Sequence, residues 1–269
     1  MSRVCGIDVG GTKIAAGIVD LGTGRVTERS QIATRPERGA DAVLDDCLAL
    51  AEALSPTTIG VAVCELGDRA GRTGSASTVD WRGRDLAAAF GAVAPARIES
   101  DVRAAALAEA RFGAGAGRGS FLYVTVSTGI SHAFVIDGVP WPGARGSAIV
   151  LGAPPVEEVA SGLALAARFG RSRAEDVLAD AAAAGAVADA AAAIGQSIAA
   201  LVNALDPESV VIGGGLGSDS RVLALIVDGL RPFIWADATR TLPVVPAALS
   251  GDAGIVGAAL ATPPGPVTG

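Results

Sequence analysis

Aromatic side chains are scarce in this sequence. They account for 4% of the residues, whereas hydrophobic residues of all kinds account for 50%. The interior must therefore be built mainly from Ala, Val, Leu and Ile, a composition that suits a tightly layered α/β fold. A chain of 269 residues is long enough for one large or two medium domains, each with a sizeable core, and we favour two lobes.

Histidine and cysteine are also rare. The chain has one histidine and three cysteines, Cys5, Cys47 and Cys64, which lie far apart in the sequence. Without a second histidine, the common Cys/His spacings of zinc sites are excluded. Scattered thiols in odd number indicate reduced cysteines in a cytoplasmic protein.

The sequence has no excess of positive charge. Its formal net charge of -7 argues against a broad nucleic-acid surface, because such surfaces need clustered Lys and Arg to neutralise phosphates. Strand-like residues begin at Arg3, which leaves no room for the charged and apolar regions of a signal peptide. Gly, Pro or charge interrupts each apolar run before it can span a bilayer. We therefore expect a soluble, cytoplasmic protein without nucleic-acid or membrane partners.

The order of predicted elements is similar in the two halves of the chain. Residues 4–33 predict three strands around two glycine turns, followed by a helix over 40–54 and the strand TIGVAVC. A comparable pair of strands, SFLYVTV and ISHAFVIDG, flanks the turn STG in the second half. Further predicted helices cover 157–169, 172–184, 186–204 and a last segment near 252–262.

The glycine-rich segment GAGAGRG, residues 113–119, is the predicted boundary between the lobes. Its glycines end the preceding helix and allow the chain to bend. We therefore predict an N-terminal lobe over 1–115 and a larger C-terminal lobe over 116–250. A hinged molecule of this kind places its site in the cleft between the lobes.

The first candidate motif is GIDVGGTK, in which Asp8 lies near the end of a predicted strand. Gly10 and Gly11 allow a tight turn whose backbone N–H groups can bind phosphate, and Thr12 and Lys13 add a hydroxyl and a positive charge. Asp8 suits a Mg²⁺ ion bound through water, because Mg²⁺ keeps much of its hydration shell. The alternative is an ordinary glycine hairpin with a capping Asp.

Two other turns are candidates for binding the rest of a nucleotide. In STGIS, Thr128 and Gly129 occupy the same place between two strands as the first glycine turn does. In VVIGGGLG, Gly214 and Gly215 follow a strand and precede a helix, so that a flat nucleoside can lie against backbone. The three consecutive glycines do not form a dinucleotide fingerprint. A packing bend is the alternative interpretation of this stretch.

The segment IESD ends a predicted strand and begins a helix. Its last residue, Asp101, can either cap the helix or accept a proton from a hydroxyl group. The neighbouring glycine turns favour the second role. The single histidine, His132, lies on the strand after the second turn, where we expect a neutral, packed or hydrogen-bonded ring.

These motifs, in the order GIDVGGTK, IESD, STGIS, GARG, EEVASG, VVIGGGLG and DAGIVGAAL, resemble the ROK family of repressors, open reading frames and kinases. The resemblance covers nearly the whole chain. It implies the two-lobe, actin-like ATPase (RNase H-like) fold with a cleft between the lobes. It also implies an ATP-dependent kinase that phosphorylates the exocyclic CH₂OH of a sugar, with an Asp as base and Mg-ATP in the cleft.

The resemblance assigns roles to individual residues. Asp101 is the implied base, and residues 251–269 are the implied C-terminal helix that packs on the N-terminal lobe. The implied nucleotide contacts are Asp8, Gly10, Gly11, Thr12, Lys13, Thr128, Gly129, Gly214 and Gly215, with Mg²⁺ near Asp8. The implied acceptor contacts are Ser100, Asp101, Arg145 and Glu157, where a one-residue shift to Glu158 is the alternative. A homodimer is a further expectation from the family.

The sequence departs from the pattern of its relatives at three places. The first predicted strand starts at once, without the winged helix that the repressor branch of the family has ahead of it, and we therefore expect no DNA binding. Ser100 stands where the family has an Asn that holds sugar hydroxyls. After GARG the family continues with a sugar-binding Glu, a zinc-binding His and a Cys-rich zinc loop, whereas this chain continues SAIVLGAPP. The sequence therefore predicts no zinc site.

These departures from the family pattern affect which acceptor the pocket should prefer. A pocket that has exchanged polar partners for apolar residues should no longer favour glucose, because a buried polar group without a partner costs about 1–3 kcal/mol. We favour an altered ring, either an amino sugar such as kanosamine or a C7-cyclitol of the valienol or valiolone type, as in ROK kinases of antibiotic pathways. The alternatives are a glucokinase with a modified pocket and a non-catalytic ROK relative that senses sugar.

Overall fold

The computed structural model describes residues 2–65, 68, 71–76, 78–152 and 155–262. The chain divides into two compact units, which are described separately. The N-terminal unit comprises Met1–Phe112, Pro142–Ala148 and Gly251–Gly269, and the C-terminal unit comprises Gly113–Trp141 and Ile149–Ser250. The predicted lobe boundary at 115/116 lies close to the first of these transitions. The return of Pro142–Ala148 to the N-terminal unit was not predicted.

A five-stranded mixed sheet forms the centre of the N-terminal unit. Its strand order is β3-β2-β1-β4-β5, in which β1 pairs antiparallel with β2 and parallel with β4. The strands are β1 Val4–Val9, β2 Lys13–Val19, β3 Val26–Ala33, β4 Thr58–Val63 and β5 Ala96–Ser100. The element order β-β-β-α-β is the one that the sequence predicts.

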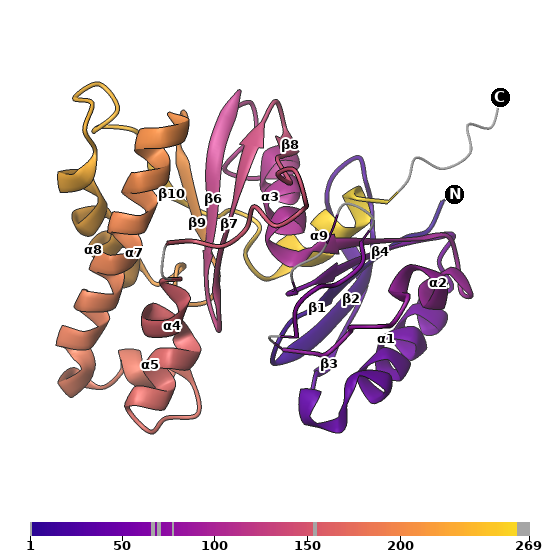
Figure 1. Cartoon of the computed structure of the whole chain (residues 1–269). Coiled ribbons are helices and arrows are strands. Elements are labelled where there is room, and N and C mark those ends of the chain that lie inside the picture. Colours follow the sequence, from indigo (N-terminus) through magenta and orange to yellow (C-terminus); the bar gives the residue numbers. More distant parts are fainter. Residues whose placement is uncertain (1, 66–67, 69–70, 77, 153–154, 263–269) are drawn as a thin grey trace. The chain divides into compact units, whose positions relative to one another are not determined.

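Helices cover both faces of this sheet (Figure 1). Alternate residues such as Ile7, Val61 and Ile98 form one core with the helices α1 and α2 and with Trp81. The opposite face packs against α3 and α9, which also contact each other. The helices of this unit are α1 Ala40–Leu54, α2 Leu86–Gly91, α3 Asp101–Phe112 and α9 Ala253–Leu260, and η1 Pro36–Arg38 and η4 Ser250–Asp252 are 3-10 turns.

Small residues bring α9 very close to the sheet and to α3. A Cβ atom added to Gly60 of β4 would overlap the Ala258 carbonyl, and one added to Gly257 would overlap the Ala104 carbonyl. Ala62, Ala104 and Ala258 form a small buried cluster between these elements. The abundance of Gly and Ala thus permits three layers of backbone to pack at short distance.

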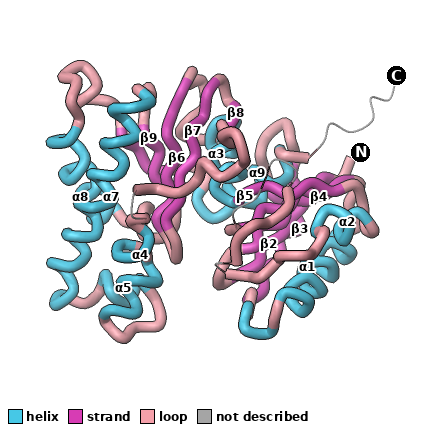
Figure 2. The backbone as a smooth tube through the Cα atoms, in the orientation of Figure 1, coloured by secondary structure: helices cyan, strands magenta, loops and turns pink. Residues whose placement is uncertain are grey.

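A second five-stranded sheet forms the centre of the C-terminal unit, in the order β10-β9-β6-β7-β8. Its strands are β6 Ser120–Val126, β7 Ile130–Ile136, β8 Val139–Pro140, β9 Val210–Gly213 and β10 Val244–Pro246. Leu122, Val124 and Ile212 pack against Ile194 and Ile198 of α7 in one continuous core. The helices α7 and α8 lie side by side (Figure 2).

The helices of the C-terminal unit are shorter than predicted at two places. The predicted helix 172–184 is wrong as a single element, because the structure has α6 followed by the 3-10 turn η2. The predicted helix 157–169 is wrong as a single element, because the structure has α4 and α5 with a break at Ser161. The Ser161 side chain accepts a hydrogen bond from the Ala164 amide at 3.2 Å and so begins a new helix. The helices are α4 Glu157–Ala160, α5 Gly162–Arg168, α6 Ala174–Leu178, α7 Ala184–Leu205 and α8 Ser220–Leu230, with η2 Ala181–Ala183 and η3 Arg231–Phe233 as 3-10 turns.

One helical stretch, Ala181–Leu205, is long and apolar enough to cross a membrane by length and composition alone. Half of its most apolar window is nevertheless buried, and its Ile194, Ile198 and Val202 belong to the core of the C-terminal unit. Core helices of soluble proteins satisfy the same criterion. This helix therefore gives only weak grounds for a membrane span.

Candidate functional site

The first predicted phosphate turn joins β1 to β2 in the N-terminal unit. The Gly10 amide donates to the Lys13 carbonyl at 3.0 Å and closes the turn. The side chains of Thr12 and Lys13 are exposed. Within the part of the chain that the structure describes, the Gly11 and Thr12 amides have no protein acceptor, and so they are available to an anion.

A residue that the sequence analysis did not single out holds this turn in place. Thr34 follows β3 and is fully buried. Its hydroxyl donates to the Gly10 carbonyl at 2.7 Å, and its amide donates to the Thr12 carbonyl at 3.2 Å. Thr34 thus fixes both ends of the turn. No motif in the sequence marks it, because the contact joins residues more than twenty positions apart.

Asp8 lies on the face of the N-terminal sheet that packs against α9. A Cβ atom at Gly254 would overlap the Asp8 carboxylate, so the start of α9 lies directly against this side chain. Burial raises the pKa of Asp8 to about 6, and the charges of Lys13 and Arg29 oppose this rise.

Asp101 is the first residue of α3, directly after β5. Its Oδ1 atom accepts a hydrogen bond from the Val102 amide at 2.6 Å. Burial, followed by repulsion from Asp8, raises the pKa of Asp101 to about 7, whereas the Val102 hydrogen bond lowers it. Asp101 therefore both binds the start of the helix and titrates near neutral pH, as a general base requires.

The two carboxylates fit a divalent cation. Asp8 and Asp101 repel each other strongly enough to raise the pKa of Asp101. Carboxylate oxygens are the ligands that Mg²⁺ prefers, and a nearby cation would offset this repulsion. Of the residues present, Asp8 is the one that would hold the ion, directly or through water.

Two further buried polar residues lie at the same end of the sheet. Glu65 lies two residues after the end of β4 and is fully buried, and its carboxylate accepts hydrogen bonds from the Ser75 hydroxyl and the Thr78 amide, both at 2.6 Å. Ser100, at the end of β5, is 2% exposed, and its hydroxyl has no partner among the described residues. Sequence reasoning identified Ser100 but missed Glu65.

The second predicted phosphate turn joins β6 to β7 in the C-terminal unit. The amides of Gly162 and Leu163, at the start of α5, donate to the carbonyls of Ser127 and Thr128 at 2.8 and 3.1 Å. Glu157 accepts a hydrogen bond from the Ile130 amide at 2.7 Å. The break between α4 and α5 thus provides the groups that fix this turn.

The position of Glu157 distinguishes it from its neighbour. A Cβ atom at Gly129 would lie 2.8 Å from a Glu157 carboxylate oxygen, so Gly129 leaves room for this side chain. Glu158 is exposed and has no comparable contact with the turn among the described residues. The structure therefore places Glu157 at the turn between β6 and β7.

The third glycine motif packs beside the second turn. Gly214 has a φ of 84°, and a Cβ atom there would overlap the Val126 carbonyl, so this position requires glycine. Gly215 is exposed, and a Cβ atom there would be 3.9 Å from the Ser127 hydroxyl. The close contact at Gly214 agrees with the interpretation of this stretch as a packing bend. Gly215 instead exposes its backbone next to the turn between β6 and β7.

Residues 4–263 match the model of the ROK family. The chain belongs to the ROK family. It is 32% identical to the bifunctional enzyme NanE/NanK of Brucella melitensis, over 96% of this chain and 53% of that protein. The chain thus spans about half the length of that relative. It is also 28% identical to the glucokinase of Streptomyces coelicolor, over 99% of this chain and 100% of that one.

A solved ROK structure has the same architecture. The ROK family glucokinase from Streptomyces griseus, in complex with glucose and AMPPNP, superposes with a TM-score of 0.86 at 26% identity, covering 97% of this chain and 99% of that one. The comparisons confirm the predicted family and the predicted two-lobe, actin-like fold. They also agree with the predicted enzyme class, an ATP-dependent carbohydrate kinase.

The segment SAIVLGAPP of this ROK chain has an apolar, partly exposed surface. Val150 forms a β-bridge with Ser131 of β7, and 48% of its surface is exposed. Arg145, in the preceding GARG, is exposed as well. Ala153 and Pro154 lie outside the described residues. Within the described residues, no three His, Cys, Asp or Glu side chains are grouped as a metal site.

The remaining predicted residue, His132, lies on β7 and is 8% exposed. Burial lowers its pKa, which favours the neutral ring. Its Nδ1 atom has no hydrogen-bond partner among the described residues. The packed, neutral state agrees with the interpretation from the sequence.

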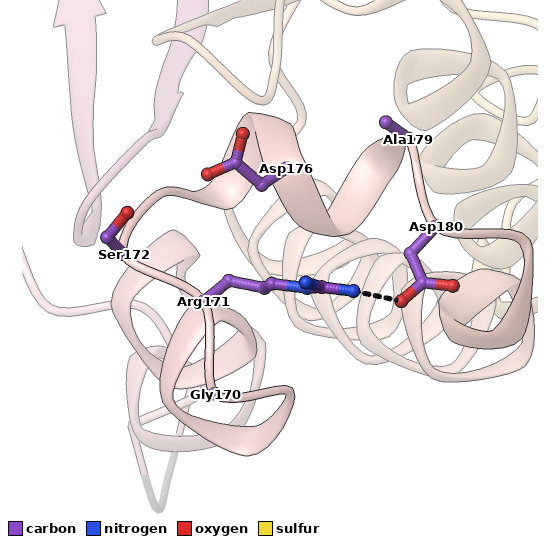
Figure 3. A pocket seen from close by; sticks show the side chains of 6 residues that line it. All are labelled: Gly170, Arg171, Ser172, Asp176, Ala179 and Asp180. Atoms are coloured by element: carbon purple, nitrogen blue, oxygen red, sulfur yellow. Dashed lines mark hydrogen bonds and ion pairs between the residues drawn. The ribbon is translucent and has the colours of Figure 1, made fainter.

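A pocket of about 520 Å³ lies in the C-terminal unit between α5 and η2 (Figure 3). It contains none of the predicted site residues. The Arg171 guanidinium in it is paired with Asp180 at 2.9 Å, and Asp176 adds a second carboxylate. This arrangement leaves no unpaired cation for a polyphosphate. The residues that line it are Gly170, Arg171, Ser172, Asp176, Ala179 and Asp180.

Proposed function

We propose that this ROK protein is an ATP-dependent kinase that phosphorylates the exocyclic primary hydroxyl of a sugar or sugar-like cyclitol. The observation that carries the proposal is Asp101, whose pKa is raised to about 7 beside the Asp8 carboxylate. A carboxyl group with such a pKa accepts a hydroxyl proton at neutral pH more readily than an ordinary, more acidic carboxylate. The same unit holds the rigid turn at Gly10–Lys13, which suits a phosphate.

The chain's residues divide the work of phosphoryl transfer. Asp101 accepts the proton of the primary alcohol. At the same time the alcohol oxygen attacks the γ-phosphorus of ATP, and ADP leaves. The Gly11 and Thr12 amides and the Lys13 ammonium group stabilise the charge that develops on the phosphates. In the C-terminal unit, Thr128 and Gly215 are the proposed nucleotide contacts. Asp8 would hold Mg²⁺, and the ion, when bound, would supply further charge neutralisation on the phosphates.

Lys13 has a special place in this scheme, because it is the only lysine in the sequence. All other cationic side chains among its 21 basic residues are arginines. Its exposed ammonium group is a compact charge that can reach a phosphate without a fixed pairing geometry. The single lysine at the turn supports an assignment of Lys13 to ATP.

An amino sugar or a C7-cyclitol is our preferred acceptor over glucose. Two features support this choice, the apolar Val150 in SAIVLGAPP and the short, unpartnered hydroxyl of Ser100. A ring hydroxyl that loses its polar partner on binding is disfavoured by about 1–3 kcal/mol. Arg145 and Glu157 remain candidate contacts for the acceptor. A glucokinase with a different pocket is the second candidate.

An acceptor screen tests the function. ATP consumption by the purified protein is measured with glucose, N-acetylmannosamine, kanosamine and valiolone-type cyclitols. We expect turnover that depends on the acceptor, with kcat/KM higher for kanosamine or a cyclitol than for glucose. Highest kcat/KM with glucose would support the second candidate. Failure of all acceptors, with sugar binding intact, would refute the kinase and support a sensor.

A further inference from the structure

Arg103 is a buried cation that the proposed reaction leaves without a role. It lies on α3, two residues after Asp101, and only 5% of its surface is exposed. Its Nε atom donates to a Glu99 carboxylate oxygen at 2.7 Å, and its Nη1 atom donates to the Gly146 carbonyl at 2.6 Å. The guanidinium therefore connects two segments that are more than forty residues apart in the sequence.

Both connected segments carry predicted acceptor contacts. Glu99 directly precedes Ser100, and the same Glu99 oxygen accepts a hydrogen bond from the Ser100 amide at 2.8 Å. Gly146 directly follows Arg145. The chain enters the N-terminal unit at Pro142 and leaves it after Ala148, so this excursion is only seven residues long, Pro142–Ala148. Arg103 thus ties the excursion to the segment that holds Ser100 and Asp101.

The geometry of the link favours arginine over lysine. A guanidinium presents several N–H groups in a rigid plane, so that one side chain bonds a carboxylate and a carbonyl in fixed directions. The turn itself needs such an anchor, because Gly143 and Gly146 have φ values of 73° and 83° and glycine does little to restrict its own backbone. A buried cation is also costly unless it is paired, as it is here with Glu99.

We infer that Arg103, oriented by Glu99, is a positioning residue for the acceptor. Arg103 holds the Arg145 turn in register with Ser100 and Asp101. This role rests on the proposed kinase function. Arg103 acts through its neighbours and makes no contact with ATP. Loss of the link to Gly146 should therefore weaken acceptor binding and leave ATP binding unchanged.

The test compares R103K with R111K. Lysine at 103 keeps the charge opposite Glu99 but lacks the second arm that reaches Gly146. Arg111 lies on the same helix, is exposed and contacts only the Phe112 ring among the described residues, so R111K is the matched control. We expect R103K to raise the KM for the acceptor by about tenfold, the effect of one lost charged hydrogen bond. The KM for ATP should stay within about twofold in both variants.

Hydrogen–deuterium exchange provides a readout that does not depend on turnover. The Ala148 amide donates to the Pro142 carbonyl at 3.4 Å and reports on the turn. A peptide that covers 141–149 should exchange faster in R103K than in wild type, whereas peptides of β1 and β2 should not change. E99Q keeps the hydrogen-bond acceptor without its charge, and we expect the same pattern at smaller amplitude.

The outcomes separate this inference from the proposed function. If the wild type phosphorylates none of the acceptors, the kinase is refuted and the role of Arg103 with it. If the wild type is active but R103K matches R111K in acceptor KM, only the inference is overturned. If R103K raises the KM for the acceptor and the KM for ATP equally, or if hydrogen–deuterium exchange increases throughout the N-terminal unit, Arg103 has a general structural role. Either result also overturns the inference.

Discussion

Single side chains determine the chemistry that this chain can perform. Asp101 is held at the first turn of α3 by the Val102 amide, yet its pKa is raised to about 7 by burial and by Asp8. The environment that would suit Asp101 to the proposed role of base therefore also makes its ionised form costly. Function and stability oppose each other at this residue.

Stability against pH tests this opposition. The folded pKa of Asp101, about 7, lies above its ordinary value of 3.8. The folded state thus holds the proton more tightly than the unfolded state, and ionisation destabilises the fold progressively between pH 3.8 and 7 and fully above that range. We expect the Tm of D101N at pH 8 to be a few degrees higher than that of wild type, because each kcal/mol of unfolding free energy shifts Tm by about 2–4 °C.

The Tm difference should shrink as the pH falls towards 4, where the Asp101 of the wild type is neutral in the folded state. Thermal unfolding at pH 5, 6, 7 and 8 checks the trend. A Tm difference that is the same at every pH would show that the carboxylate of Asp101 is not destabilised by its surroundings.

At the scale of the elements, segments outside each hairpin hold the turns between β1 and β2 and between β6 and β7. In the N-terminal unit Thr34 fixes the turn between β1 and β2, and in the C-terminal unit Glu157 and the start of α5 fix the turn between β6 and β7. Each turn is therefore stiffened by a segment outside its own hairpin. In the proposed function, such support keeps the backbone amides in place for a phosphate before the phosphate binds.

Thr34 provides the second test. T34V keeps the size and the branched shape of the side chain but removes the hydroxyl that donates to Gly10. The lost hydrogen bond leaves the Gly10 carbonyl unpaired and should cost about 1–3 kcal/mol. We expect a KM for ATP raised about fivefold to tenfold, with the KM for the acceptor unchanged, in steady-state assays.

T34S is the matched control, because it restores the hydroxyl and should keep a KM for ATP close to the wild-type value. Together, T34V and R103K form a cross-comparison, since T34V is expected to change only ATP binding and R103K only acceptor binding. A T34V protein with normal ATP kinetics would show that the turn does not need this anchor.

The sequence predicted local elements better than the supports between them. Gly10, Asp8 and Asp101 were recognisable because strand residues, glycines and acidic residues follow one another directly. Thr34, Glu65 and Arg103 were not, because their contacts join segments that only the fold brings together. The break at Ser161 was also missed, since Ala-rich sequence on both sides favours helix and conceals a capping serine.

At the scale of the whole molecule, the chain is two α/β units, each with one of the two turns that we propose to bind phosphate. The N-terminal unit contains Asp8, Asp101 and the Pro142–Ala148 excursion, and the C-terminal unit contains Thr128 and Gly215. The predicted cleft between the lobes stays a prediction. Family membership and fold agree with the sequence analysis, whereas the choice of acceptor depends on a segment, SAIVLGAPP, that departs from the family pattern.

The most direct test of the account is turnover by D101N. Phosphoryl transfer from ATP is measured for wild type and D101N with the best acceptor from the screen, and ATP binding and Tm are measured on the same samples. We predict that D101N binds ATP and stays folded but loses turnover by about 10²–10⁴-fold, the usual contribution of a general base. A folded D101N protein with nearly full turnover would contradict the assignment of Asp101 as the base.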